Sequence, residues 1–237
     1  MNYNYQKISG SSCAAYESTS GAGDAQKIKW RVDWDIAQDS NADLVKGYEF
    51  VGLTQNLETR LSEIASIPAE WTWVRSNETA YKGKAVQILS LVRWCYANQI
   101  DAGNVAFDFM TSDTKGDSTS SSAQELMIWL RYEGGQLPIG WVDGPVATID
   151  GLFEKDGWKL YQGKNEDTGI TVSSLLVDID NQFRGEFQGD LRDWLVAISK
   201  QGVFSEDTYV NVGNGGMEPF YGKVSFENEL GLRINLL

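Results

Sequence analysis

The chain has 237 residues and a formal net charge of −13, from 33 acidic and 20 basic side chains. An acidic chain repels phosphate backbones and anionic lipid surfaces, so nucleic acids and membranes are poor partners, whereas a neutral polymer meets no such repulsion. The chain has no histidine, and its only thiols are Cys13 and Cys95. This composition excludes Ser-His-Asp and Cys-His nucleophiles, and also zinc sites made of histidines or of four thiolates. Acid–base chemistry is therefore left to Asp, Glu, Tyr, Lys or Cys.

The first half of the chain contains two clear strand patterns and two ambiguous segments. Trp30–Asp35 (WRVDWD) alternates its apolar side chains onto one face, as strands do. Two segments are ambiguous between a helix and a buried strand: Leu57–Ile67 and Lys84–Gln99. The periodicity of their apolar residues does not decide between the two structures. Asn104–Met110 (NVAFDFM) alternates again and places Asp108 on the face opposite its two phenylalanines.

The second half reads as further short strands and one helix. In Glu125–Arg131 (ELMIWLR) one face is Leu/Ile/Leu, and the other carries Glu125, Met127, Trp129 and Arg131. Further strands are predicted at Trp158–Tyr161, Ile170–Ile179, Thr208–Val212 and Lys223–Asn235. Asp-Gly turn signals at 143–144, 150–151 and 156–157 separate some of them. Many short strands with such turns favour a sandwich or jelly roll.

One helix is predicted before Gly202, which is a typical helix stop. Its apolar residues recur at helical spacing and are Phe187, Leu191, Trp194, Leu195 and Ile198. We find no internal repeat and no linker composition, and the one low-complexity stretch, Gly116–Ser122, is predicted to be a loop. We therefore expect a single domain over residues 1–237.

No stretch of the sequence reaches the roughly 20 apolar residues that a membrane span needs. The N-terminus, MNYNYQKISG, has no apolar signal core. Either a signal has been removed from the natural chain or the protein is not secreted. Two cysteines allow one disulfide but do not demand it.

Three carboxyl groups are candidate catalytic residues, but each could also be an ordinary structural or surface residue. Glu125 shares a strand face with Met127 and Trp129, but it could be an exposed residue at the start of a strand. Glu218 lies in the glycine-rich apolar segment Val212–Gly222 (VGNGGMEPFYG), which could equally be a turn. Asp108 could face water, or it could hydrogen-bond another carboxyl. Tryptophans stack well on sugar rings, yet we expect most of the nine to fill the core.

At these segments the sequence resembles glycoside hydrolase family 12, the endoglucanases and xyloglucanases. Gln124–Gly140 (QELMIWLRYEGGQLPIG) is similar to the family's nucleophile strand, and Gly215–Gly222 (GGMEPFYG) to its acid/base segment. Val105–Ser112 (VAFDFMTS) resembles its strand with the assisting aspartate. WRVDWD, Ser66–Trp73 (SIPAEWTW) and SFENELGLRIN resemble other strands in the same order, so the resemblance covers roughly residue 27 onward.

The resemblance implies an all-β jelly-roll sandwich of two antiparallel sheets, with a single helix packed on the convex side and a substrate cleft on the concave sheet. By position, Glu125 would be the nucleophile, Glu218 the general acid/base and Asp108 the partner of the nucleophile. The resemblance places these further residues along the cleft: Met127, Trp129, Trp34, Pro138, Asn165 and Phe220.

The chemistry implied by the resemblance fits the composition. A retaining glycosidase needs two carboxyls about 5–5.5 Å apart, and it requires no histidine, metal or organic cofactor. A protonated Asp108 would donate a hydrogen bond that keeps Glu125 ionised, whereas an ionised Asp108 would raise the pKa of Glu125 by repulsion. The sequence leaves both states open.

The chain also departs from the family's pattern. Tyr3–Ser9 stands where the family carries an Asn-Leu-Trp-Gly segment, so a sugar-stacking tryptophan is missing there. Cys13 resembles only the second cysteine of the family's N-terminal disulfide, and residues about 78–103, with Cys95, look like an insertion. These changes would reshape one side of the cleft.

We therefore expect a retaining endo-β-1,4-glucanase that acts on β-glucan as an extracellular monomer, without cofactor or metal. The Pro-Ile-Gly sequence at 138–140 leans toward endoglucanases, and a xyloglucan-specific endoglucanase is the near alternative. A non-catalytic carbohydrate-binding sandwich, or a decoy for an inhibitor protein, is the alternative from another class.

Overall fold

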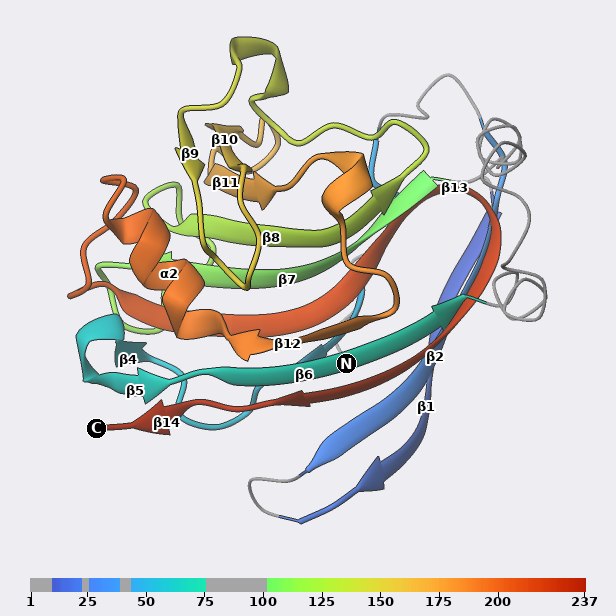
Figure 1. The fold of residues 1–237 in the computed structure, drawn as a ribbon, viewed down its shortest axis with the longest axis horizontal. Helices are drawn as coiled ribbons and strands as arrows, with labels where there is room; N and C mark the ends of the chain where they lie inside the picture. The colour runs from blue at the N-terminus through green and yellow to red at the C-terminus, as the bar shows by residue number, and fades with distance from the viewer. Residues whose placement is uncertain (1–9, 23–25, 39–43, 76–101) are drawn as a thin grey trace.

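Two layers of β-strands face each other across an apolar core in the computed structural model, which describes residues 10–22, 26–38, 44–75 and 102–237 (Figure 1). The first sheet runs in the order β3, β13, β7, β8, β11, β10, β9, with β4 also paired to β13. Its bounds are β3 Glu49–Gly52, β4 Thr59–Arg60, β7 Ala102–Ser112, β8 Gln124–Glu133, β9 Ala147–Ile149, β10 Trp158–Lys164, β11 Thr171–Leu176 and β13 Tyr209–Leu232.

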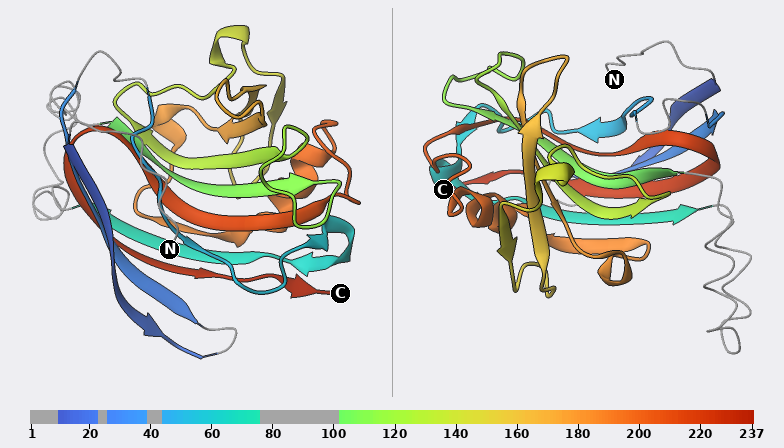
Figure 2. Two further views of the ribbon diagram at one scale, coloured as in Figure 1. Left: turned by 180° about the vertical axis from the view of Figure 1, so that it is seen from behind. Right: turned by 90° about the horizontal axis from the view of Figure 1, so that it is seen from above.

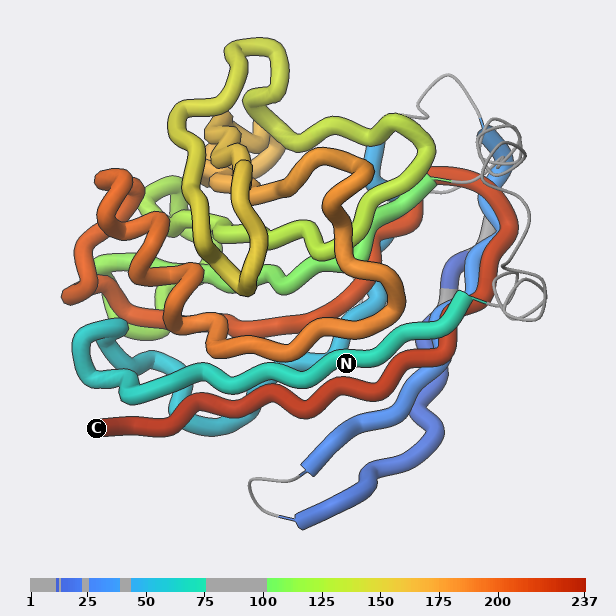
Figure 3. Tube along the Cα trace, viewed as in Figure 1, coloured from blue at the N-terminus to red at the C-terminus, as the bar shows by residue number. Residues whose placement is uncertain are grey.

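The second sheet runs in the order β1, β2, β13, β6, β12, so β13 belongs to both layers. Its remaining strands are β1 Gly10–Ser20, β2 Lys27–Ile36, β6 Pro68–Arg75 and β12 Glu186–Asp190. A separate short pair joins β5, Ile64–Ser66, to β14, Asn235–Leu236. The trace in Figure 3 shows the red β13 segment turning from one layer into the other. The jelly-roll sandwich that we expected is confirmed.

Strand β13 is longer than the sequence predicted. We expected two strands, Thr208–Val212 and Lys223–Asn235, and the sequence left a turn between them open, but residues 209–232 form one continuous strand. Glycines make its close packing possible. A Cβ atom at Gly215 would lie 2.7 Å from a Leu230 methyl carbon, and one at Gly216 would lie 2.6 Å from the Glu49 carbonyl oxygen. A larger residue at Gly215 would push the two layers apart, and one at Gly216 would push β3 away from β13.

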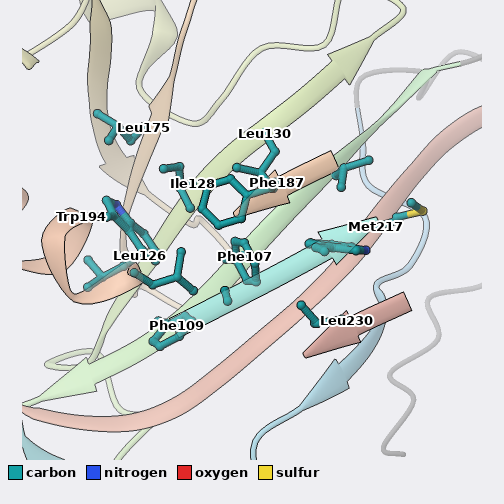
Figure 4. Close-up of a cluster of buried hydrophobic side chains, with 14 of the residues drawn as sticks. Phe107, Phe109, Leu126, Ile128, Leu130, Leu175, Phe187, Trp194, Met217 and Leu230 are labelled. Atoms are coloured by element: carbon teal, nitrogen blue, oxygen red, sulfur yellow. The ribbon is translucent and has the colours of Figure 1, made fainter. Parts of the chain in front are cut away.

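The core lies between the two sheets and takes the inward face of each strand (Figure 4). Phe107 and Phe109 of β7 and Leu126 and Ile128 of β8 are fully buried in it. Burying one such side chain contributes about 1.5–3 kcal/mol. Most of the described tryptophans are also core residues, as predicted. The core therefore fixes which face of β7 and β8 points away from it.

Helix α2, Leu191–Ser199, begins later than predicted. Phe187 fits the helical spacing, but it lies in β12 and pairs with Trp71 of β6. Asp190 ends that strand and caps the helix, because its carboxylate accepts a hydrogen bond from the Arg192 amide at 3.0 Å. The chain leaves the helix through Gly202, whose φ is +80°. Figure 2 shows the orange helix at one end of the sheets.

The expectation of purely antiparallel sheets is wrong at one place: β11 runs parallel to β8, with Val172 beside Glu125. The ambiguous segment Leu57–Ile67 contains β4, a 3₁₀ turn at Leu61–Glu63 and β5, with Leu61 buried. Lys84–Gln99, Cys95 and nearly all of the suspected insertion lie outside the described residues. Within the described ranges, no helix is long and apolar enough to cross a bilayer.

Candidate active site

Three carboxyl groups share the face of the first sheet that points away from the core. In the register of β7 and β8, Asp108 lies opposite Met127, and Met110 lies opposite Glu125. In the register of β13 and β7, Glu218 lies opposite Asn104. Directly paired residues point to the same side of a sheet, and positions two apart share a face. We call the surface that carries Glu125, Asp108 and Glu218 the carboxylate face.

Burial raises the pKa values of all three carboxyls, and repulsion by nearby carboxylates adds to this at Asp108 and Glu218. Burial and the nearby charges of Glu125 and Glu218 raise the pKa of Asp108 well above its ordinary value. Burial raises the pKa of Glu125, and burial with the Glu125 charge among its causes raises that of Glu218 to about 8. Since like charges in one site oppose joint ionisation, the group retains protons at neutral pH.

Asn104 of β7 holds Glu218 in place. Its side-chain amide donates a hydrogen bond to a Glu218 carboxylate oxygen, and its amide oxygen accepts the Glu218 backbone N–H at 3.4 Å. Asn104 is itself buried, so this pairing is shielded from water. This hydrogen bond favours the ionised form of Glu218 and so lowers its pKa. Burial raises the pKa by more, so the net shift is upward. Our sequence interpretation did not single out Asn104, although its position follows from the alternation that placed Asp108.

Strand β3 and the residue before it bring two further groups near Glu218 that the sequence did not indicate. Glu49 pairs with Met217, is 3 % exposed and accepts a hydrogen bond from the Ser12 hydroxyl. Burial raises the pKa of Glu49 to about 7, and its charge in turn raises the pKa of Glu218. The Tyr48 hydroxyl is buried with no hydrogen-bond partner among the described residues. Burial and the charges of the three carboxyls raise the pKa of Tyr48 well above its usual value.

An apolar cluster continues the carboxylate face beyond the carboxyls. Met127 and Trp129, which the sequence assigned to the cleft, lie in it, and each is almost fully buried. The cluster has these members: Ala106, Met127, Trp129, Tyr161, Val172 and Leu176, with Tyr132 packed against them. It extends across β8, β11 and β10. The carboxylate face therefore has titratable groups in one part and this apolar cluster in another. We call the cluster the apolar floor.

The remaining predicted cleft residues are placed less favourably for contact with a ligand. Trp34 is 4 % exposed and packs on Phe226, with ring centroids 5.5 Å apart, although it also shares a small pocket with Asn104. Phe220 lies in the main core. Pro138 is buried, and the Asn165 amide oxygen accepts the backbone N–H groups of Asp167 and Thr168 in the β10–β11 turn. Their roles stay predictions.

The carboxylate face can perform acid–base and nucleophilic chemistry with carboxyls alone. Glu218, with its raised pKa, is suited to donate a proton near neutral pH, and a neighbouring carboxylate can act as a nucleophile. The described residues contain no group of three or more Cys, Asp or Glu placed to hold a metal ion. Both catalytic glutamates predicted from the sequence are thus on one face with Asp108.

Comparisons with known proteins identify the family to which the chain is similar. The model of the family described as glycosyl hydrolase family 12 matches residues 2–229. The xyloglucan-specific endo-β-1,4-glucanase A of Aspergillus aculeatus is 31% identical over 215 residues, which cover 90% of this chain and 74% of that protein.

Two solved structures share the fold. The catalytic domain of Humicola grisea Cel12A, determined with a soaked thio cellotetraose, has a TM-score of 0.74 at 22% identity, covering 96% of this chain and 87% of that one. Trichoderma harzianum endoglucanase 3 has a TM-score of 0.69 at 22% identity, covering 96% and 85%.

Proposed function

The chain belongs to glycosyl hydrolase family 12, and from this we propose that it cleaves β-1,4-glucan chains with Glu125 as nucleophile and Glu218 as general acid and base. The protein is a glycoside hydrolase of the endo-β-1,4-glucanase type. The observation that carries the assignment of roles is the common carboxylate face, on which Glu218 has a pKa of about 8. The roles of individual residues are part of the proposal.

The first step forms a covalent bond to the enzyme. The Glu125 carboxylate attacks the anomeric carbon, and the bond from that carbon to the glycosidic oxygen breaks. Glu218 gives its proton to the departing oxygen, so the leaving sugar departs as a neutral alcohol. A pKa of about 8 keeps Glu218 protonated at neutral pH before this step.

The second step uses the same residues with reversed charges. Glu218 is now a carboxylate and takes a proton from a water molecule, whose oxygen attacks the anomeric carbon and releases Glu125. Glu125 is an uncharged ester in the intermediate, so its contribution to raising the pKa of Glu218 disappears. Loss of that repulsion makes the ionised form of Glu218 easier to maintain when it must act as a base.

Asp108 supports Glu125 in this proposal. Its pKa is raised well above the ordinary value by burial and by both glutamates, which favours the protonated form. Of the two states that the sequence left open, the protonated one therefore suits the site better. A neutral Asp108 avoids a third negative charge next to the nucleophile and offers an O–H to it.

Unsubstituted β-glucan is the substrate that we propose first, and xyloglucan is the second candidate. The second is favoured by a specific observation, because the Aspergillus aculeatus relative is named for xyloglucan. The reaction would take place outside the cell, where polymeric glucans are found.

The test is a reducing-sugar assay on barley β-glucan, carboxymethylcellulose and xyloglucan. Wild type would be compared with Glu125→Gln and Glu218→Gln, and with Glu186→Gln as a control at an exposed position of β12. We expect wild type and the control to release sugar, and both active-site variants to be strongly impaired. Equal rates for wild type and the two active-site variants would refute the proposed roles and favour a binding protein.

A further inference from the structure

The segment between β8 and β9 carries an unusual exposed tryptophan, Trp141. It lies in a 3₁₀ turn, Trp141–Asp143, and 40 % of its surface is exposed. The described tryptophans are otherwise buried in the core or in the apolar floor. Figure 1 shows this segment, in yellow-green, rising beyond the sheet between β8 and β9. Nothing in the sequence resemblance assigned a role to this residue.

Trp141 packs against the apolar floor of the carboxylate face. Its ring packs on that of Tyr161, with centroids 4.8 Å apart and planes inclined by 33°. Tyr161 belongs to the same cluster as Met127 and Trp129. The register places Met127, Ser174 and Tyr161 in one row across β8, β11 and β10. Trp141 therefore adds an accessible aromatic surface to a row that starts beside Asp108.

The backbone around Trp141 is held rigidly against β10. A Cβ atom at Gly140 would lie 2.2 Å from the Gln162 carbonyl oxygen, and one at Gly163 would lie 2.7 Å from an Ile139 methyl carbon. Gly140 has a φ of +86°, which favours glycine. The Trp141 amide donates to the Pro138 carbonyl at 3.1 Å. An aromatic surface fixed in this way loses little entropy when it binds a ligand.

We propose that Trp141 is a distal stacking platform for a sugar ring of a long β-glucan chain. The inference rests on the proposed function. From β7 to β10 the sheet spans three strand spacings, about 14 Å, so a chain that reaches Trp141 from Asp108 must contain several linked units. The platform is specific for chain length, because a short oligosaccharide bound at the carboxyls does not extend to it.

A neutral sugar polymer suits the surroundings of Trp141. Most of the nearby exposed side chains are apolar, namely Leu137, Ile139, Val142 and Val146, although Asp143 in the same turn is also exposed. Sugar rings present apolar C–H faces, and these faces pack well on the flat surface of a tryptophan ring. The continuity of the patch with the apolar floor favours the same ligand on both.

The test measures binding of cellohexaose and cellobiose by calorimetry in a Glu125→Gln background, which prevents hydrolysis. Adding Trp141→Ala should weaken cellohexaose binding about three- to tenfold, the range expected for one aromatic stacking contact. Cellobiose binding should not change. Trp141→Phe should restore most of the affinity for cellohexaose. Val142→Ala, at a neighbouring side chain that is 95 % exposed, is the matched control and should behave like the background protein.

Equal effects of Trp141→Ala on both sugars, or no effect on either, would overturn the platform. If Trp141→Ala instead converts a dimer into a monomer in sedimentation without changing the sugar affinities, the patch is an interface between copies of the chain, and the platform is again overturned. Thermal unfolding of each variant separates lost binding from lost folding, and Trp141→Phe keeps the test valid if the alanine variant unfolds. These outcomes are independent of catalysis, because failure of the proposed function is detected separately as wild type that does not hydrolyse glucan.

Discussion

Replacing Glu49 with glutamine should become more stabilising, relative to wild type, as the pH rises from 4 to 8. Glu49 is 3 % exposed, and burial raises its pKa from 4.5 to about 7 in the folded protein. One carboxylate oxygen accepts a hydrogen bond from Ser12, but the other is buried without a partner among the described residues. The ionised form is therefore disfavoured by the fold.

The direction of this pH dependence follows from whether the Glu49 carboxyl is protonated in the folded and in the unfolded chain. Below pH 4.5 the carboxyl is protonated in both the folded and the unfolded chain, so it has no effect on the pH dependence. Between pH 4.5 and about 7 the unfolded chain releases this proton and the folded protein keeps it, so stability falls as pH rises. The difference of about 2.5 pH units corresponds to about 3 kcal/mol at pH 8.

Urea unfolding at pH 4, 6 and 8 measures this effect. Glutamine keeps an oxygen that can accept the Ser12 hydroxyl, and any cost of its buried amide is the same at each pH. We expect the free energy of unfolding of Glu49→Gln, relative to wild type, to rise by about 3 kcal/mol from pH 4 to pH 8. Glu186→Gln changes the net charge equally at an exposed site and should show little such rise. A difference between Glu49→Gln and wild type that stays constant across this range would refute the reasoning.

Three further predictions concern single residues. Glu218→Gln should lower kcat about 10²–10⁴-fold, the contribution of a general acid, and a loss smaller than tenfold in steady-state assays would contradict its role. Gly216→Ala should lower stability by about 1–3 kcal/mol and reduce activity, because its Cβ would lie 2.7 Å from a ring carbon of Tyr48; unchanged thermal unfolding would show that β3 yields easily. Asp190→Ala should cost about 1–2 kcal/mol in urea unfolding, because it removes the helix cap and the acceptor for the Ile67 amide at 2.6 Å, whereas Asp190→Asn should retain most of that stability.

Local patterns predicted the parts of the site that depend on one strand. Alternation alone placed Glu125, Met127 and Trp129 on one face and Asp108 opposite the phenylalanines of its strand, and the register confirms that these two faces coincide. The pattern could not show that Glu218 shares this face, because that depends on the pairing of β13 with β7. The family resemblance supplied this information.

Residues that reach the site from distant strands were missed for the same reason. Glu49 acts on Glu218, and Asn104 hydrogen-bonds to it, only because β3 and β7 both pair with β13, and no local signal reveals that pairing. The glycines near Glu218 belong to a continuous strand that packs closely on Leu230 and Glu49, whereas the sequence left a turn open there.

Helix and strand periodicities also overlap over short distances. Phe187 fits the helical series that continues at Leu191, yet it lies in β12, where it packs on Phe107 with ring centroids 5.4 Å apart. Tertiary packing against the core decides the structure of such a residue, and a helical spacing of four positions is too short to exclude a strand. The helix start was therefore predicted one turn too early.

The most direct test of the proposed mechanism is to trap the intermediate. The protein would be incubated with a 2-deoxy-2-fluoro cellobioside that carries an activated leaving group, digested, and its peptides analysed by mass spectrometry. A retaining mechanism with Glu125 as nucleophile predicts one fluorocellobiosyl group, attached to the peptide that contains Glu125 and absent in Glu125→Gln. A label on any other carboxyl, or hydrolysis of glucan with no label at all, would contradict it.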